Sequence, residues 1–321
     1  MLSDMPWLFV LAGLALLSVG GEGLVRGSSR LARRLGVSPL VIGLTIVAFG
    51  TSSPELFVSI GAALSGRGDI AVGNVVGSNI SNIGCILAIC AMVFPLRVDM
   101  QILRVDMPVA LFATLVAAVV LSDGRVGRGE AVLLLVGLLT YTVLTVRAAR
   151  REQTPALREE YAASVPTPAG SARRDFAMIV GGLLGLALGA RLMVDGATTI
   201  ARAAGVSDAV IGLTIVAIGT SLPEFSASLI AVFRRQPDLA VGNIVGSNIF
   251  NVLGILGAAG AVEPLRAYDL RGFDIGVMVG FTVLLLPFMK TGFRLQRWEG
   301  ALLFAGYVAY LVHLAGRGPA G

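Results

Sequence analysis

The segment VIGLTIVAFGTSSPELFVSIGAALSGRGDIAVGNVVGSNISNIG at 41–84 recurs at 210–253 as VIGLTIVAIGTSLPEFSASLIAVFRRQPDLAVGNIVGSNIFNVL. The copies lie 169 residues apart, align without a gap and are identical at 26 of 44 positions. Each places a glutamate, Glu55 or Glu224, in a run apolar enough to cross a bilayer. A carboxylate is costly at that depth and normally faces a pathway or a bound cation. The duplication therefore predicts one cation site built from two halves of a membrane protein.

The composition excludes most soluble classes of protein. Of the 321 residues, 55% are hydrophobic and 14% are charged, and the mean hydropathy is +0.84. The net charge of +5 does not indicate nucleic-acid binding, because the basic residues lie between apolar runs, where they orient a membrane protein. No nucleophile–base set and no nucleotide loop is visible, so we expect neither an enzyme nor a cofactor.

The apolar runs predict an all-α membrane protein with ten transmembrane helices, each near the ~20 residues that a bilayer needs. Run length and the lack of strict alternation favour helices over a barrel. The expected spans are 6–25, 39–64, 70–94, 104–122, 130–147, 176–198, 209–233, 239–262, 272–289 and 298–316. The first and sixth helices should continue beyond the membrane, to about Arg34 and Ala203.

The loop charges predict the orientation. If both termini lie outside, the inner loops carry 17 Lys and Arg residues and the outer loops carry seven, as the positive-inside rule requires. Five spans per repeat is an odd number, so the second copy enters the membrane in the opposite sense. We expect a first five-helix repeat at 1–148, a cytoplasmic linker at 149–174 and an inverted second repeat at 175–321, in the inner membrane of the cell.

Polar side chains follow helical spacing inside the repeated spans. In the first copy they recur at i, i+3, i+4 and i+7 in one span and at every fourth residue in the next, which places them on one face of each helix. The second copy repeats both stripes. The stripe residues are Ala48, Thr51, Ser52, Glu55, Asn74, Ser78 and Asn82, and then Ala217, Thr220, Ser221, Glu224, Asn243, Ser247 and Asn251. Four such helices imply that the stripes face one another.

The chemistry of the stripes favours hard cations. Pro54 and Pro223 precede the glutamates, and each proline frees the carbonyl four residues back, which belongs to Gly50 or Gly219. Carboxylates, amides, hydroxyls and free carbonyls are the oxygen ligands that Ca²⁺ accepts, and they also suit Na⁺. Zinc and copper sites would use nitrogen or sulfur ligands. Two carboxylates match the charge of one Ca²⁺ or two Na⁺, which would let the two ions compete for one site.

The paired segments GTSSPE…GNVVGSNISN and GTSLPE…GNIVGSNIFN resemble the two alpha-repeats of the sodium/calcium exchanger family. The resemblance covers the whole chain and implies Ca²⁺ extrusion driven by Na⁺ entry, with alternating access. By this resemblance the carboxylates of Glu55 and Glu224 bind Ca²⁺, and Thr51 and Thr220 offer it backbone carbonyls. The implied Na⁺ ligands are Ala48, Ser52 and Ser78 with Ala217, Ser221 and Ser247, and Asn82 and Asn251 complete the central site.

Three other functions remain open from the sequence. A Ca²⁺/H⁺ antiporter could use the same glutamates, although the hydroxyl-rich GTS segment favours Na⁺ and His313, the only histidine, lies near the C-terminus. A cation channel or a membrane scaffold without transport is less favoured, because inverted repeats with broken helices indicate alternating access. The expected partners are Ca²⁺, Na⁺ and the lipid bilayer, with no nucleic acid and with a monomer sufficient for transport.

Overall fold

The computed structural model describes residues 6–35, 37–151, 171–204, 217–267 and 272–316. The predicted linker 149–174 lies largely outside these residues, as does the first part of the predicted span 209–233. In the first half the elements are α1 Pro6–Leu35, α2 Pro39–Ile42, η1 Gly43–Val47, α3 Ala48–Thr51, α4 Ser53–Leu64, α5 Gly68–Ser81, η2 Asn82–Leu87, α6 Ala88–Val93, β1 Leu96–Arg97, η3 Ile102–Asp106, α7 Met107–Val120, η4 Leu121–Asp123, β2 Arg125–Val126 and α8 Arg128–Arg151.

The second half repeats this order. Its elements are α10 Ala172–Ala203, α12 Ala217–Thr220, α13 Leu222–Phe233, α14 Pro237–Phe250, η6 Asn251–Leu256, α15 Gly257–Val262, β3 Leu265–Arg266, α16 Gly272–Lys290, η7 Thr291–Phe293, β4 Arg294–Leu295 and α17 Arg297–Gly316. The bounds of α4, α5, η2 and α6 recur 169 residues later in α13, α14, η6 and α15. The sequence offset thus persists as an offset in the elements.

Two short antiparallel strand pairs join the halves. β1 pairs with β4, and β2 pairs with β3. The partners are Leu96 with Leu295 in one pair and Val126 with Leu265 in the other. A shift of 169 residues converts β1 into β3 and β2 into β4, so it exchanges the two pairs. Each half therefore contributes one strand to each pair.

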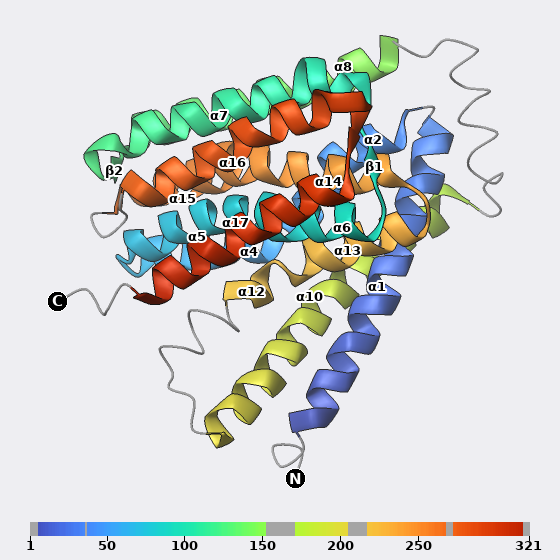
Figure 1. Cartoon of the computed structure of the whole chain (residues 1–321), viewed down its shortest axis with the longest axis horizontal. Coiled ribbons are helices and arrows are strands. Elements are labelled where there is room, and N and C mark those ends of the chain that lie inside the picture. Colours follow the sequence, from blue (N-terminus) through green and yellow to red (C-terminus); the bar gives the residue numbers. More distant parts are fainter. Residues whose placement is uncertain (1–5, 36, 152–170, 205–216, 268–271, 317–321) are drawn as a thin grey trace.

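Helices α1 and α10 are antiparallel neighbours and extend together from the rest of the bundle (Figure 1). Along α1, Gly13 approaches the backbone of Gly189, Gly20 approaches Gly182, and Gly27 approaches Asp175. Glycine is required at this interface because an added Cβ would meet backbone atoms of the other helix at 2.6–2.9 Å. The first helix of each half thus runs opposite to the other, as an inverted repeat would require.

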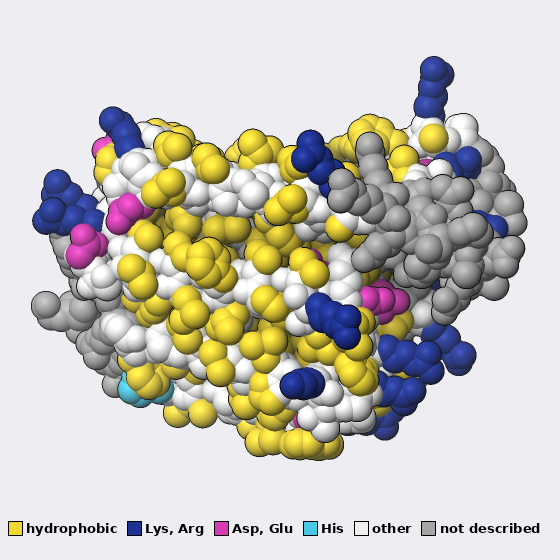
Figure 2. Space-filling view, turned by 90° about the horizontal axis from the view of Figure 1, so that it is seen from above, with side chains coloured by type: hydrophobic (Ala, Val, Ile, Leu, Met, Phe, Trp, Pro, Cys, Tyr) yellow, Lys and Arg dark blue, Asp and Glu magenta, His cyan; other side chains and the backbone are white. Residues whose placement is uncertain are grey.

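Apolar length supports a membrane protein. Among the described residues, seven helices are long and apolar enough to span a bilayer, and the bent pair Leu40–Thr51 and Ser53–Leu64 could form an eighth span. The shorter apolar helix Leu222–Phe233 follows the part of the chain that is not described. Hydrophobic side chains cover the middle of one face of the molecule, and most Lys and Arg side chains on it lie toward the ends (Figure 2). The prediction of an all-helical membrane protein is confirmed.

The most buried span is α14 continued by η6 and α15, whose apolar window is fully enclosed by the protein. Small residues allow this. Gly242 meets the backbone carbonyl of Leu40, and Gly246 meets that of Leu44. Close backbone contact of this kind is typical of G-x-x-x-G pairs in membranes. It places the polar stripe of α14 directly against the segment that leads to Thr51.

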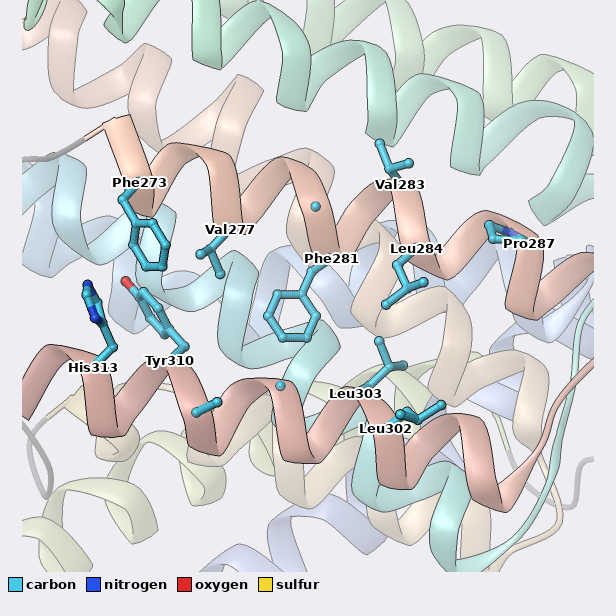
Figure 3. Close-up of a pocket in the computed structure, with 13 residues that line it drawn as sticks. Phe273, Val277, Phe281, Val283, Leu284, Pro287, Leu302, Leu303, Tyr310 and His313 are labelled. Carbon is cyan, nitrogen blue, oxygen red and sulfur yellow. The ribbon is translucent and has the colours of Figure 1, made fainter.

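Helices α16 and α17 leave an apolar groove of about 740 Å³ between them (Figure 3). Phe281 lies on the wall of this groove and approaches Gly84 of η2, where an added Cβ would meet its ring at 3.0 Å. Tyr307 approaches the same glycine from α17. Aromatic side chains therefore pack against one side of η2, the segment that begins with Asn82.

The helix pair α1–α10 generates a prediction with a matched control one residue away. A Cβ at Gly182 would lie 2.6 Å from the Leu24 nitrogen, whereas a Cβ at Gly181 meets no described atom within 4 Å. Overpacking of this kind costs about 1–3 kcal/mol. Gly182→Ala should therefore lower the unfolding temperature of the purified protein in detergent, and Gly181→Ala should not. Equal unfolding temperatures would contradict the packing of α1 against α10.

Candidate ion site

The candidate site begins where two helices break. Ser52 and Ser221 leave helical geometry, with φ/ψ of −81°/6° and −91°/6°, and α4 and α13 start directly after them. The axes on either side of Ser52 differ by 45°. A proline in the first turn of each new helix is compatible with this start, because the missing N–H has no partner there anyway. The expectation of one continuous helical stripe from Ala48 to Glu55 is therefore wrong: Thr51 ends one helix and Glu55 belongs to the next.

The break places both carboxylates favourably. Glu55 and Glu224 lie in the first turns of α4 and α13, where the helix dipole stabilises negative charge. Each is almost fully buried, with 2% and 1% of its surface exposed. Ionised groups at that depth require partners. The new helix start therefore supplies part of the stabilisation, and other side chains supply the rest.

The two carboxylates are held by serines of the opposite half. Ser52 Oγ lies 2.8 Å from Glu224 Oε1, and Ser221 Oγ lies 3.3 Å from Glu55 Oε1. Ser52 Oγ also lies 3.0 Å from Ser247 Oγ. Each hydroxyl can donate a hydrogen bond to the carboxylate across the boundary between the halves. The predicted residues Ser52, Ser221, Ser247 and both glutamates thus form one cluster.

Two asparagines of the stripes support the helix breaks. Asn74 Nδ2 donates to the Glu55 carbonyl at 3.1 Å and to Ser59 Oγ at 2.9 Å. Asn243 Nδ2 makes the equivalent bonds to the Glu224 carbonyl at 3.4 Å and to Ser228 Oγ at 2.9 Å. Asn74 and Asn243 therefore hold the backbone that carries each carboxylate.

Thr51 connects this support to the other half, because its hydroxyl lies 3.2 Å from Asn243 Oδ1 and 3.4 Å from the Ala48 carbonyl. Sequence reasoning missed Ser59 and Ser228. Both keep the 169-residue offset, which is the signal that could have identified them.

The central amides form a second crossed pair of contacts. Asn82 Nδ2 donates to Asn248 Oδ1 at 2.9 Å, and Asn251 Nδ2 donates to Asn79 Oδ1 at 2.9 Å. Asn82 opens η2 and Asn251 opens η6. Both segments are π-helical, a geometry that is often found at functional sites. The amides predicted for the site therefore bond to Asn79 and Asn248, which the prediction did not include.

Four buried oxygens at this place accept no hydrogen bond from any described residue. They are Glu55 Oε2, Glu224 Oε2, Asn82 Oδ1 and Asn251 Oδ1. Buried polar atoms in native proteins are nearly always satisfied. One such oxygen on each of four predicted site residues is the arrangement expected of ligands for a cation. Two of them belong to each half.

The remaining predicted residues fall into two groups. Ala48 and Ser78 are buried, with 0% and 6% of their surface exposed. Thr220 is half-buried at the end of α12. Ala217 begins α12, but its side chain lies outside the part of the chain that the structure describes.

Comparison with known proteins gives a consistent result. Residues 5–147 and 175–316 match the sodium/calcium exchanger protein family. The putative antiporter CaxA of Alkalimonas amylolytica is 41% identical over 94% of this chain and 96% of its own. The inner membrane protein YrbG of Escherichia coli is 38% identical over 95% of each chain.

An exchanger and a solved structure are also similar. The sodium/calcium exchanger MaX1 of Methanosarcina acetivorans is 32% identical over 96% of this chain and 98% of its own. A structure of the sodium-calcium exchanger NCX_Mj, soaked with zero Na⁺ and Ca²⁺, superimposes with a TM-score of 0.85 at 34% identity, covering 97% of this chain and 99% of that one. The family resemblance drawn from the repeated motifs is confirmed, and the chain belongs to the sodium/calcium exchanger family of membrane transporters.

Proposed function

We propose that this protein exchanges Na⁺ for Ca²⁺ across the cell membrane by alternating access, through a site between its two halves. The observation that carries the proposal is the set of four unsatisfied oxygens on Glu55, Glu224, Asn82 and Asn251. Two carboxylates would neutralise one Ca²⁺, and the amide oxygens would extend its coordination without further charge. Both ions are transported substrates rather than cofactors.

The proposed architecture has ten spans in two inverted five-helix repeats, at 1–148 and 175–321, with both termini outside. The antiparallel course of α1 and α10 supports the inversion, and the constant offset of the elements supports the duplication. The bent pair α2–α4 and its partner around α12–α13 would each make one span. A location in the inner membrane agrees with the name of the relative YrbG.

The proposed ligand roles follow the chemistry of each group. Glu55 and Glu224 would bind Ca²⁺ together with the backbone carbonyls of Thr51 and Thr220. The Na⁺ ligands would be hydroxyls and carbonyls of the two stripes. They are Ala48, Ser52 and Ser78 in the first half, and Ala217, Ser221 and Ser247 in the second. Because these oxygens surround the same two carboxylates, occupancy by Na⁺ would displace Ca²⁺.

Charge gives a physical reason for coupling. Two ionised carboxylates in a low-dielectric interior repel each other and lack the solvation that water would provide. A site that binds neither Ca²⁺ nor Na⁺ would therefore cross between its two open states at high energetic cost. Either ion removes that cost by neutralising the pair. Exchange, rather than uncoupled leak, is the expected result.

The two glutamates provide the direct test of the site. Glu55→Gln and Glu224→Gln preserve side-chain size but remove half of the carboxylate charge, which should weaken Ca²⁺ binding by several kcal/mol at an effective dielectric of about 20. Each variant should insert normally and lose Ca²⁺ uptake into proteoliposomes. Glu263→Gln is the matched control, because Glu263 is half-exposed and lies 3.9 Å from Arg128 at the surface. Wild-type uptake by either site variant would remove the assignment.

The coupling ion is tested by separating two gradients. Proteoliposomes loaded with Na⁺ should take up Ca²⁺ when the outside contains no Na⁺ and the pH is equal on both sides, because the stripes offer neutral oxygens suited to Na⁺. A pH gradient in the complete absence of Na⁺ should drive little uptake. Uptake that follows the pH gradient and ignores Na⁺ would instead identify a Ca²⁺/H⁺ antiporter that uses the same glutamates. Ca²⁺ movement that follows its own gradient without either counter-ion would identify a channel.

A further inference from the structure

We propose that Asn79 and Asn248 are positioning residues, which fix the amides of Asn251 and Asn82 so that their oxygens face the transported cation. This inference rests on the proposed function, and it deepens that proposal by assigning a role to two residues outside the predicted ligand set. Asn79 belongs to α5 and Asn248 to α14. Each acts on an amide of the opposite half.

The hydrogen-bond pattern determines which end of each amide faces the site. A carboxamide has a donor end and an acceptor end of nearly equal size. Asn251 donates its Nδ2 to Asn79 Oδ1, and Asn82 donates its Nδ2 to Asn248 Oδ1, both at 2.9 Å. The opposite ends are the two unsatisfied oxygens, Asn251 Oδ1 and Asn82 Oδ1. Anchoring the nitrogen therefore directs the oxygen.

Asn79 is itself oriented by its neighbours. Its Nδ2 donates to the backbone carbonyl of Asn248 at 3.3 Å and lies 3.9 Å from the sulfur of Met278 in α16. With its donor end occupied in this way, its acceptor end faces Asn251. Only 1% of Asn79 and 7% of Asn248 is exposed. Protein contacts, rather than solvent, thus set the direction of Asn79.

Orientation matters because the two ends of an amide act oppositely on a cation. An oxygen binds the ion, whereas an N–H group repels it and would instead donate to the neighbouring carboxylates of Glu55 or Glu224. If Asn79 lost its acceptor, nothing would distinguish the two orientations of Asn251. Loss of one such preference should weaken Ca²⁺ binding about ten-fold, the effect of a single hydrogen bond.

The first measurement is Ca²⁺ binding to the purified protein by calorimetry, alongside KM and kcat for Ca²⁺ uptake in proteoliposomes. Asn79→Leu should raise both the Kd and the KM for Ca²⁺ about ten-fold, with kcat nearly unchanged. Asn79→Asp keeps an acceptor oxygen in either protonation state and should bind Ca²⁺ more tightly than Asn79→Leu. Thr114→Val is the control for loss of a buried polar group, because Thr114 is buried and bonds only within its own helix, to the Ala110 carbonyl.

The decisive measurement repeats the comparison in a chain that carries Asn251→Asp. A carboxylate has oxygen at both ends, so its orientation no longer matters. In that background Asn79→Leu should change the Kd by less than about two-fold, well below one hydrogen bond. A residue that merely packs α5 against the other half would cause the same loss in both backgrounds, and that result would overturn the proposal.

A second pair keeps the test independent of the folding of one variant. If Asn79→Leu does not fold, Asn248→Leu compared with and without Asn82→Asp decides the question by the same criterion. Glu55→Gln is measured in parallel. If Glu55→Gln still binds Ca²⁺, the proposed ion site itself fails. If Glu55→Gln loses binding and Asn79→Leu does not, only the positioning role fails.

Discussion

The structure depends on the burial of two carboxylates, Glu55 and Glu224, which face each other across the boundary between two similar halves. A carboxylate in the interior of a membrane protein is costly unless it is hydrogen-bonded and neutralised. Neither half supplies enough for its own glutamate. Ser221 reaches Glu55 from the second half, and Ser52 reaches Glu224 from the first. This mutual requirement explains why the halves must pack with their repeated segments face to face.

The same constraint explains the irregular backbone around the site. A helix interior would leave each glutamate without favourable backbone dipoles, whereas a helix start provides them. The chain therefore breaks at Ser52 and Ser221, and Asn74 and Asn243 tie the carbonyl of each glutamate to a nearby serine. On the facing helices the π-helical segments begin at the central asparagines. Irregular geometry thus occurs where the protein must direct polar groups toward one point.

Much of this arrangement could be predicted from the sequence, because duplication and burial leave clear traces. The repeated motif identified the family and most of the clustered residues, and the apolar runs identified the helical membrane fold. The position of the break at Ser52 was not predicted, since Pro54 reveals a lost hydrogen bond but not where the helix axis turns. The roles of Asn79 and Asn248 were also not predicted, because residue type does not reveal which end of an amide faces a neighbour. Their 169-residue offset was visible, but only the contacts give it meaning.

The central claim is that Ca²⁺ and Na⁺ share one site that both halves build. Equilibrium Ca²⁺ binding to the purified protein, measured over a range of Na⁺ concentrations at constant ionic strength and pH, tests it most directly. The account predicts one Ca²⁺ per chain, with a Kd that rises steadily as Na⁺ increases and a stoichiometry that stays constant, because charge allows either one Ca²⁺ or two Na⁺ beside Glu55 and Glu224. A Kd that is independent of Na⁺, or simultaneous binding of both ions at saturation, would contradict it.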